Sequence, residues 1–288
     1  MKLFGSWFSV WLLSLPLSAQ VSVKVVPDQD QFLPGETLPV AVQISNRSGQ
    51  TLHLGGEEDW VTFSVESKDG FVVSKSGEVP VKGDFVLDSS KVATKRVDLS
   101  PHFELGRPGR YLVTATVRIK EWDREFSGKP AAFDIITGTK LWEQEFGVPL
   151  RAGQSGDPEV RKYALQQANY LKRELRLYAR VTDASEAKVF RVFSIGPLVS
   201  FSRPEPQVDK SSNLHVLCQS GARAFTYSVI NPDGELVARQ TYDYINSRPR
   251  LKVDDAGKIV VVGGLRRPTR DDLPVPENAA NDLKSSKP

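Results

Sequence analysis

The sequence predicts an all-β protein, an antiparallel β-sandwich followed by about two β-meander repeats of roughly 45 residues each. Apolar and polar residues alternate in short runs, which turn residues separate. The motif Ser-Arg-Pro at 202–204, with Val208 and Asp209, recurs at 247–254 together with the apolar run that follows it. The 288 residues, 40% hydrophobic and 25% charged, have the balance of a globular protein of two domains.

Residues 1–19 have the pattern of a secretory signal peptide. Lys2 precedes an apolar stretch, and small residues before Gln20 predict cleavage after Ala19. The alternative is an uncleaved membrane anchor, but the stretch is short for a span and contains Pro16. Cys218 is the only cysteine, so no internal disulfide can form. We therefore expect an exported protein, periplasmic or secreted, without stable membrane insertion.

Residues 20–137 carry the sandwich pattern, with about seven short strands and no helical spacing. Every second residue is apolar in these strands, so each has one buried face. Asn46-Arg47-Ser48 fits both a glycosylation site and an ordinary turn that ends at Gly49, and we favour the turn. The clearest strands lie at 21–25, 38–44, 61–65, 91–99, 111–119 and 133–136.

Two segments of this domain resemble bacterial immunoglobulin-like modules. One is the run from Leu33-Pro34-Gly35-Glu36 into the strand at 38–44, and the other is Gly109-Arg110-Tyr111 at the start of a late strand. The second is similar to a tyrosine corner, in which the Tyr hydroxyl bonds to backbone upstream. Such modules include macroglobulin-like domains and a bacterial intracellular proteinase inhibitor. The resemblance implies a spacer or binding role without choosing between them.

Residues 138–158 contain several glycines and prolines, which predict an irregular linker. Leu141, Trp142 and Phe146 stand out in it. We expect these side chains to dock the linker on a neighbouring domain. The alternative is an exposed aromatic binding site.

Residues 159–265 carry the repeat, and one unit resembles a propeller blade. Its strands are expected at 214–219, 224–230, 235–242 and 250–253, with an Asp233-Gly234 hairpin turn and a further strand at 259–262. Residues 159–171 fit a helix or a strand, and the repeat favours the strand.

Only about two and a third blades are present, fewer than a closed propeller needs. The strands therefore form an open sheet packed on the rest of the chain, or copies of the protein pair through edge strands as a homo-oligomer. Residues 266–288, rich in proline and polar residues, are expected to form a disordered tail.

The catalytic candidates are weak. His215 and Cys218 could form a thiol dyad, but residues three apart on a strand face opposite sides. The acidic run 57–59 beside His53 is the other candidate, as a metal or hydrolase site. No calcium-loop or zinc spacing surrounds it, so a solvated loop is expected. The repeated Asp209 and Asp254 are expected to cap turns rather than hold an ion.

We therefore expect no catalytic residues, no metal site and no cofactor. The sequence predicts a non-enzymatic binding or structural protein of the bacterial envelope, which contacts another protein or a polysaccharide. Trp122 and Trp142 are its candidate partner contacts. A proteinase inhibitor and a cryptic hydrolase are the alternatives. Nucleic acid is not expected as a partner, since the net charge is only +3 and no basic stripe carries interleaved aromatics.

Overall fold

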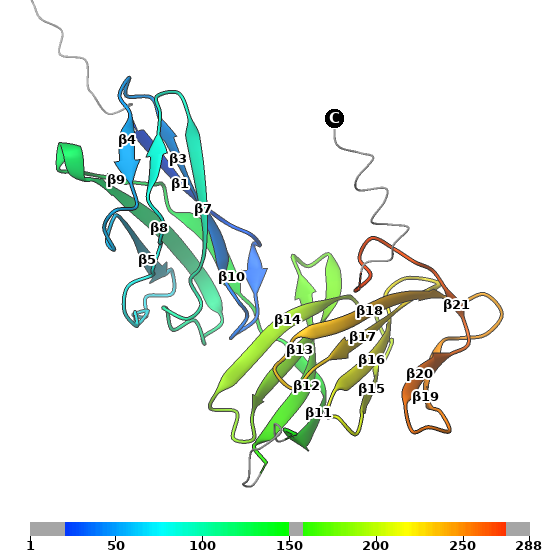
Figure 1. The fold of residues 1–288 in the computed structure, drawn as a ribbon. Coiled ribbons are helices and arrows are strands. Elements are labelled where there is room, and N and C mark those ends of the chain that lie inside the picture. Colours follow the sequence, from blue (N-terminus) through cyan, green and yellow to red (C-terminus); the bar gives the residue numbers. More distant parts are fainter. Residues whose placement is uncertain (1–20, 150–157, 275–288) are drawn as a thin grey trace, which may run out of the picture.

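The computed structural model describes residues 21–149 and 158–274, and their regular secondary structure is almost entirely β-strand, as predicted (Figure 1). The helical element among them is one 3-10 turn, η1 (Lys120–Trp122). None of the helices in this part of the chain has the length and hydropathy needed to cross a membrane. The predicted signal peptide and its cleavage after Ala19 lie outside the described residues.

The first half of the chain forms a β-sandwich. One sheet has the order β1 (Val21–Pro27), β3 (Pro39–Asn46), β7 (Val92–Asp98). The facing sheet has the order β2 (Gln31–Phe32), β10 (Ala131–Ile135), β8 (Gly109–Ile119), β5 (Val61–Ser67), with β9 (Arg124–Ser127) beside β8. A separate ribbon pairs β4 (Leu52–Leu54) with β6 (Phe85–Leu87).

Apolar and polar residues alternate along the strands of the sandwich, so each strand has one face that can be buried. In β8 every second residue from Tyr111 to Ile119 is buried, and the residues between them are half-buried. The buried faces of both sheets share one continuous apolar core. The strands β2, β4, β6 and β9 were not predicted, because two to four residues are too few to show a period of two. One pairing, β2 with β10, is parallel.

The tyrosine corner expected at Tyr111 is present. Its hydroxyl donates a hydrogen bond of 2.6 Å to the carbonyl oxygen of Arg107. The ring is buried, stacks on Phe133 with centroids 5.5 Å apart, and meets the edge of Phe71. This bond fixes the turn that leads into the central strand of the sandwich.

The second half of the chain forms two meander sheets and a hairpin. The first sheet runs β11 (Thr139–Gly147), β12 (Val160–Tyr170), β13 (Glu174–Asp183), β14 (Val189–Pro197). The second runs β15 (Glu205–Val208), β16 (Leu214–Gln219), β17 (Ala224–Ile230), β18 (Leu236–Asp243), and ends on β21 (Leu265–Arg266). The hairpin is β19 (Arg250–Val253) and β20 (Ile259–Val262).

The sequence repeat corresponds to a structural repeat. β19 and β20 occupy the places in the motif at 247–262 that β15 and β16 occupy in the motif at 202–219. Leu214, Val216 and Cys218 on β16 pack between the two meander sheets. Leu217, from the other face of β16, packs with Leu251 of the hairpin. The units therefore stack face to face. The strand at 250–253 was expected to complete the unit that begins at 214, but it pairs with β20 and opens a third unit of two strands.

Two local expectations change, and the strand favoured for residues 159–171 is confirmed. The irregular linker contains β11, because Thr139–Gly147 pairs along its length with β12 and the glycines stand near the strand ends. Residues 159–171, open between helix and strand, are strand β12 over Val160–Tyr170. The start of the predicted tail is ordered, because Asp272 is buried and accepts hydrogen bonds from Arg266 and Thr269. The sequence prediction looked for apolar residues to bury, and this contact is made by polar ones. Residues 150–157 and 275–288 lie outside the described residues.

The sandwich contacts the first meander sheet directly. Leu33 of the sandwich is buried with Ala168, Tyr178 and Val192 of the meander sheet. The guanidinium of Arg180 donates a hydrogen bond of 3.0 Å to the Pro34 carbonyl. The turn that presents Leu33 is closed by its own amide, which donates to the buried Glu36 carboxylate at 2.9 Å. Burial raises the pKa of Glu36.

Candidate functional site

A groove opens beside β4, β6 and the end of β8. In Figure 1 these elements lie at the end of the sandwich that points away from the meander sheets. The volume of the groove is about 640 Å³. The ribbon β4–β6 and the end of β8 with η1 form its walls. Its lining residues are His53, Leu54, Gly55, Gly56, Glu57, Trp60, Asp84, Phe85, Val86, Arg118, Lys120 and Glu121.

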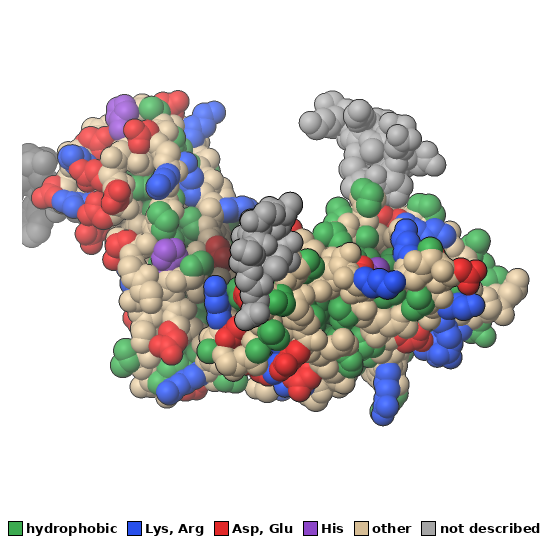
Figure 2. Space-filling view, turned by 60° about the horizontal axis from the view of Figure 1, so that its bottom comes forward, with side chains coloured by type: hydrophobic (Ala, Val, Ile, Leu, Met, Phe, Trp, Pro, Cys, Tyr) green, Lys and Arg blue, Asp and Glu red, His purple; other side chains and the backbone are tan. Residues whose placement is uncertain are grey.

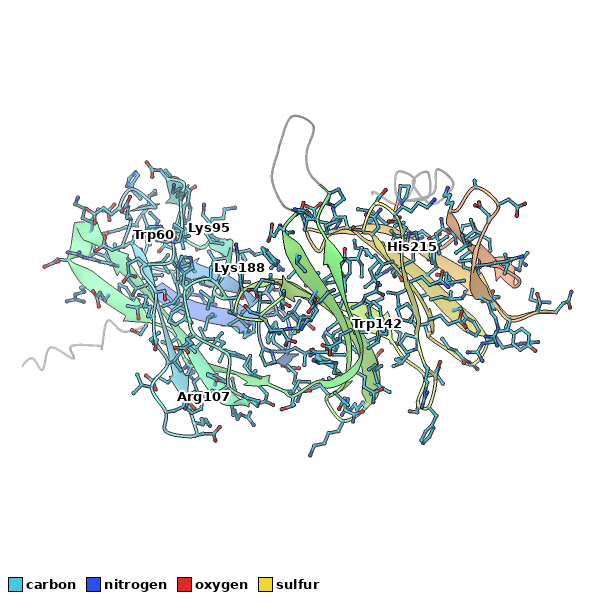
Figure 3. The ribbon with its side chains drawn as sticks, turned by 90° about the horizontal axis from the view of Figure 1, so that it is seen from below. Trp60, Lys95, Arg107, Trp142, Lys188 and His215 are labelled. Atoms are coloured by element: carbon cyan, nitrogen blue, oxygen red, sulfur yellow. The ribbon has the colours of Figure 1, made fainter. Side chains whose placement is uncertain are left out.

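The floor of the groove is apolar and held in place. Trp60 is buried, and its indole Nε1 donates a hydrogen bond of 2.7 Å to the Val81 carbonyl. Its ring meets Phe85 edge to face, with centroids 5.6 Å apart, and the Lys95 ammonium lies 4.6 Å from the Phe85 ring (Figure 3). Val86 beside them remains 58% exposed. The floor therefore offers a ligand the apolar surface of Val86 and the accessible part of Phe85, which the buried Trp60 holds in place.

A glycine sets one wall of the groove. Gly55 has a φ of +92°, and a Cβ added to it would lie 2.4 Å from the Gly83 carbonyl oxygen. Only glycine permits both this left-handed backbone and this close approach of two loops. The contact holds the loop after β4 against the segment that leads into β6.

The rim of the groove carries charges that pair with one another. Glu57 accepts a hydrogen bond from Lys120, and this hydrogen bond, above all, raises the pKa of the lysine. Asp59 lies 3.4 Å from Arg118, and Glu121 lies 3.3 Å from His53 Nδ1. Figure 2 shows acidic and basic side chains interleaved over this end of the molecule. Exposed pairs of this kind contribute little to stability, so they can exchange partners at low cost.

The acidic run 57–59 beside His53 was noted in the sequence, and the structure places His53 and Glu57 in this groove. The sequence did not show their partners, because Arg118 and Lys120 lie some sixty residues away and arrive through sheet pairing. Trp60, which follows the acidic run directly, was also missed as a site residue. The available signal in the sequence was a large aromatic residue directly after three acidic residues.

Trp122 and Trp142 do not form one site. Trp122 ends η1, donates from Nε1 to Gln50 Oε1 at 3.2 Å, and packs half-buried on the sandwich core beside the groove. Trp142 lies on β11 and packs against the core between the meander sheets (Figure 3). Phe146 on the same strand is buried, and its ring stacks on that of Tyr163 with centroids 4.0 Å apart. Leu141, the third apolar residue of the predicted linker, is 36% exposed.

His215 and Cys218 face opposite sides of β16, as the strand period predicts. His215 Nδ1 lies 2.7 Å from the Tyr227 hydroxyl, and Nε2 lies 3.0 Å from Asp209 Oδ2. A carboxylate only accepts, so Nε2 carries a proton. Cys218 is buried in the core between the meander sheets, where burial raises its pKa to about 12. The arrangement gives the histidine a structural role and leaves the thiol inert.

Asp209 and Asp254 cap turns, as expected. Asp209 Oδ1 accepts from the amides of Ser211 and Asn213, each at 2.8 Å. Asp254 Oδ1 accepts from the amides two and four residues on, at 3.0 and 2.8 Å. Within residues 21–149 and 158–274, no group of three or more His, Cys, Asp or Glu side chains is arranged to hold a metal ion.

The groove therefore combines a rigid apolar floor with a rim of exchangeable charges, the composition of a recognition site. Its chemistry has to be interpreted from its own geometry. No protein-family model and no curated protein sequence matches this chain.

Proposed function

We propose that the protein is a non-enzymatic binding protein, and that the groove at the end of the sandwich receives an apolar side chain of a partner protein. The observation that most supports this proposal is the floor of the groove. Trp60 and Phe85 are held in place there, beneath a rim of paired charges. Binding sites of this kind concentrate affinity in a central apolar pocket and specificity in a polar surround. The rim pairs can open and re-form with opposite charges of the partner.

The expected setting is the bacterial envelope. The signal-peptide pattern at 1–19 and the single cysteine support an exported protein, periplasmic or secreted. The partner would then be another envelope protein. A polysaccharide in the same groove is a weaker match, because the floor is more apolar than a sugar requires.

Photocrosslinking tests this proposal. A photoreactive phenylalanine analogue at Val86, which lines the groove and is 58% exposed, is expected to capture a discrete partner in the native host. The same analogue at Val72, 92% exposed and outside the groove, is the matched control. Val86→Asp is then expected to weaken binding of the purified partner about tenfold or more, because it places a charge on the apolar floor. Equal capture at both positions would contradict the proposal.

The same groove supports a hydrolase as the alternative, through His53 and the carboxylates of Glu57 and Glu121. Turnover of a substrate panel that is lost when 57–59 are all changed to Ala would favour it over binding. A proteinase-inhibitor role rests on the sandwich resemblance alone. Assays against serine, cysteine and metalloproteinases test that role.

Pairing of copies through an edge strand stays a prediction. Among the described strands, β20 pairs with β19 alone, and Val262 at its end is 40% exposed. We expect a discrete oligomer by light scattering during size exclusion, because an unpaired apolar edge favours strand addition. Val260→Lys on the same strand is expected to shift it to monomer. A wild-type monomer would mean that the edge is not used.

A further inference from the structure

A second cavity lies where two equivalent loops meet. Residues 198–204 connect β14 to β15, and residues 244–249 connect β18 to β19. Each loop carries one copy of the Ser-Arg-Pro motif, at 202–204 and 247–249. They enclose a pocket of about 460 Å³ between β15 and the β19–β20 hairpin, which are neighbours in Figure 1. The groove on the sandwich does not include any of these residues.

Three arginines line this pocket. Arg203 and Arg248 come from the two copies of the motif, and Arg250 follows at the start of β19. Arg250 lies 3.5 Å from the Glu205 carboxylate, and the Arg248 guanidinium lies 5.2 Å from the Phe225 ring. In the part of the chain that the structure describes, no carboxylate lies within 4 Å of Arg203 or Arg248. The pocket thus holds more positive charge than its own carboxylate balances.

Two further features face the same cavity. The Ser202 hydroxyl is buried and has no hydrogen-bond partner among the described residues. Phe201 is fully exposed and has a φ of +63°. A bulky residue with left-handed backbone is uncommon, and such strain tends to occur at functional positions. Here it presents an aromatic ring to solvent at the mouth of a cationic pocket.

We propose that this pocket binds an anionic saccharide. Guanidinium groups of Arg203 and Arg248 hold a carboxylate or phosphate on the sugar through paired N–H···O bonds. The ring of Phe201 covers a face of the sugar, and the Ser202 hydroxyl, which is closed to solvent here, gains a partner when its side chain rotates toward the bound sugar. The remaining walls are polar. Gln219 Nε2 already donates to two backbone carbonyls, and Glu205 accepts from Arg250 and the Leu251 amide, so Ser200 and the Gln219 side-chain oxygen are the groups left for sugar hydroxyls.

The exposed ring of Phe201 favours a saccharide over an acidic peptide. Arginine clusters bind acidic peptides as well as acidic sugars, but an aromatic ring beside them also covers the apolar face of a sugar ring. The repeat explains how the site arises. One motif, used twice at the same place in successive units, brings two arginines to one cavity because the units stack face to face.

Calorimetric titration of the purified protein tests the proposal. The probes are trigalacturonic acid for a carboxylate, glucose 6-phosphate for a phosphate, neutral maltotriose, and hexaglutamate as the acidic peptide. Arg203→Ala and Arg248→Ala are each expected to weaken binding of the acidic sugar roughly tenfold or more, with Arg203→Lys intermediate because it keeps the charge without the planar fork. Phe201→Ala is expected to weaken binding of trigalacturonate. Inorganic phosphate, a fifth probe that lacks a sugar ring, is expected to bind this variant and the wild type equally.

Arg124→Ala, an exposed arginine on β9 of the sandwich, is the matched control and is expected to bind like wild type. Melting temperatures verify that each variant is folded. Tight binding of trigalacturonate alone assigns a carboxylated sugar, and tight binding of glucose 6-phosphate assigns a phosphorylated one. Equal binding of maltotriose, equal or tighter binding of hexaglutamate, no binding of either acidic sugar, or an equal loss in Arg124→Ala would overturn the proposal. The groove proposal is independent of every one of these outcomes.

Discussion

Single polar atoms hold several key residues of this protein in place. Asn46, in the predicted turn, is fully buried, and its side-chain amide donates to the carbonyls of Leu87 and Gln50 at 2.8 and 2.7 Å. Its Oδ1 accepts from the Ser48 amide at 3.0 Å. The turn interpretation is therefore confirmed, and the side chain is too enclosed to carry a glycan in this fold.

Tyr111→Phe is expected to lower the free energy of unfolding by about 1 kcal/mol, because it leaves the Arg107 carbonyl without its 2.6 Å hydrogen bond. The melting temperature should fall by about 2–4 °C. Tyr244→Phe is the control, since Tyr244 is 42% exposed. Equal stability of the two variants would mean that the tyrosine corner does not stabilise the sandwich.

Cys218 is expected to resist thiol reagents in the folded protein. Burial raises its pKa to about 12, and the thiolate is the reacting species. Labelling with Ellman's reagent in native buffer should be more than about a hundredfold slower than in denaturant. Ser76→Cys, in an exposed loop, should label quickly in the same protein. Rapid native labelling of Cys218 would restore the thiol as a functional candidate.

Four turns of the meander sheets and the hairpin have the same side-chain cap, but the cap after β15 makes an additional contact with a neighbouring strand. The turns after β13, β15, β17 and β19 each use a side-chain oxygen of Asp or Asn to accept backbone amides. Asp209, after β15, also bonds to His215 on the neighbouring strand. That extra contact links a local turn to the core between the second sheet and the hairpin.

The contribution of Asp209 to stability is expected to depend on pH. Burial alone would raise its pKa, but hydrogen bonds from His215, Asn213 and Ser211 outweigh burial and leave it lowered. A carboxylate with a lowered folded-state pKa stabilises the fold fully above its unfolded value, about 4, and loses that stabilisation as pH falls through the folded value.

Asp209→Asn should therefore cost about 1–2 kcal/mol at pH 7, and the difference from wild type should shrink below about pH 4. Urea unfolding across pH 2–8 measures it. Asp254→Asn is the matched control, because Asp254 accepts two backbone bonds in the equivalent turn without a histidine partner. A pH-independent difference for Asp209→Asn would contradict the assigned role of its charge.

At the scale of the whole molecule, the sandwich and the first meander sheet are joined through the turn at Leu33. Leu33 packs with residues of the meander sheet and not with the sandwich core. Hydrogen bonds from Arg180 to the Pro34 carbonyl and from the Leu171 amide to Gln31 Oε1 surround this contact. The apolar contact and its hydrogen bonds set the orientation of the two halves.

Leu33→Asp is expected to release the two halves, because it buries a charge in this apolar contact. The radius of gyration from small-angle X-ray scattering should increase, and the thermal transition should split in two. Leu38→Ala, inside the sandwich core, is the control: it should lower stability by about 2–5 kcal/mol without a change in native dimensions. An unchanged radius for Leu33→Asp would show that the remaining contacts hold the halves together.

The sequence by itself determined the strands, the capped turns, the tyrosine corner and the repeat, because each depends on neighbours a few residues apart. Alternation predicted β8, and the pattern of the repeat unit predicted the strands that became β16 to β20, but not β15. Local signals failed where they were too short, as in β4 and β6, or where pairing overrode glycines near the strand ends, as in β11.

Only the tertiary structure decided both candidate sites. Sheet pairing brings Arg118 and Lys120 to the acidic run at 57–59, and unit stacking brings Arg203 to Arg248. Residues this far apart meet through the order and packing of sheets, which no local period encodes. The sequence therefore showed which charged and aromatic residues were available, and the fold decided which of them share a groove.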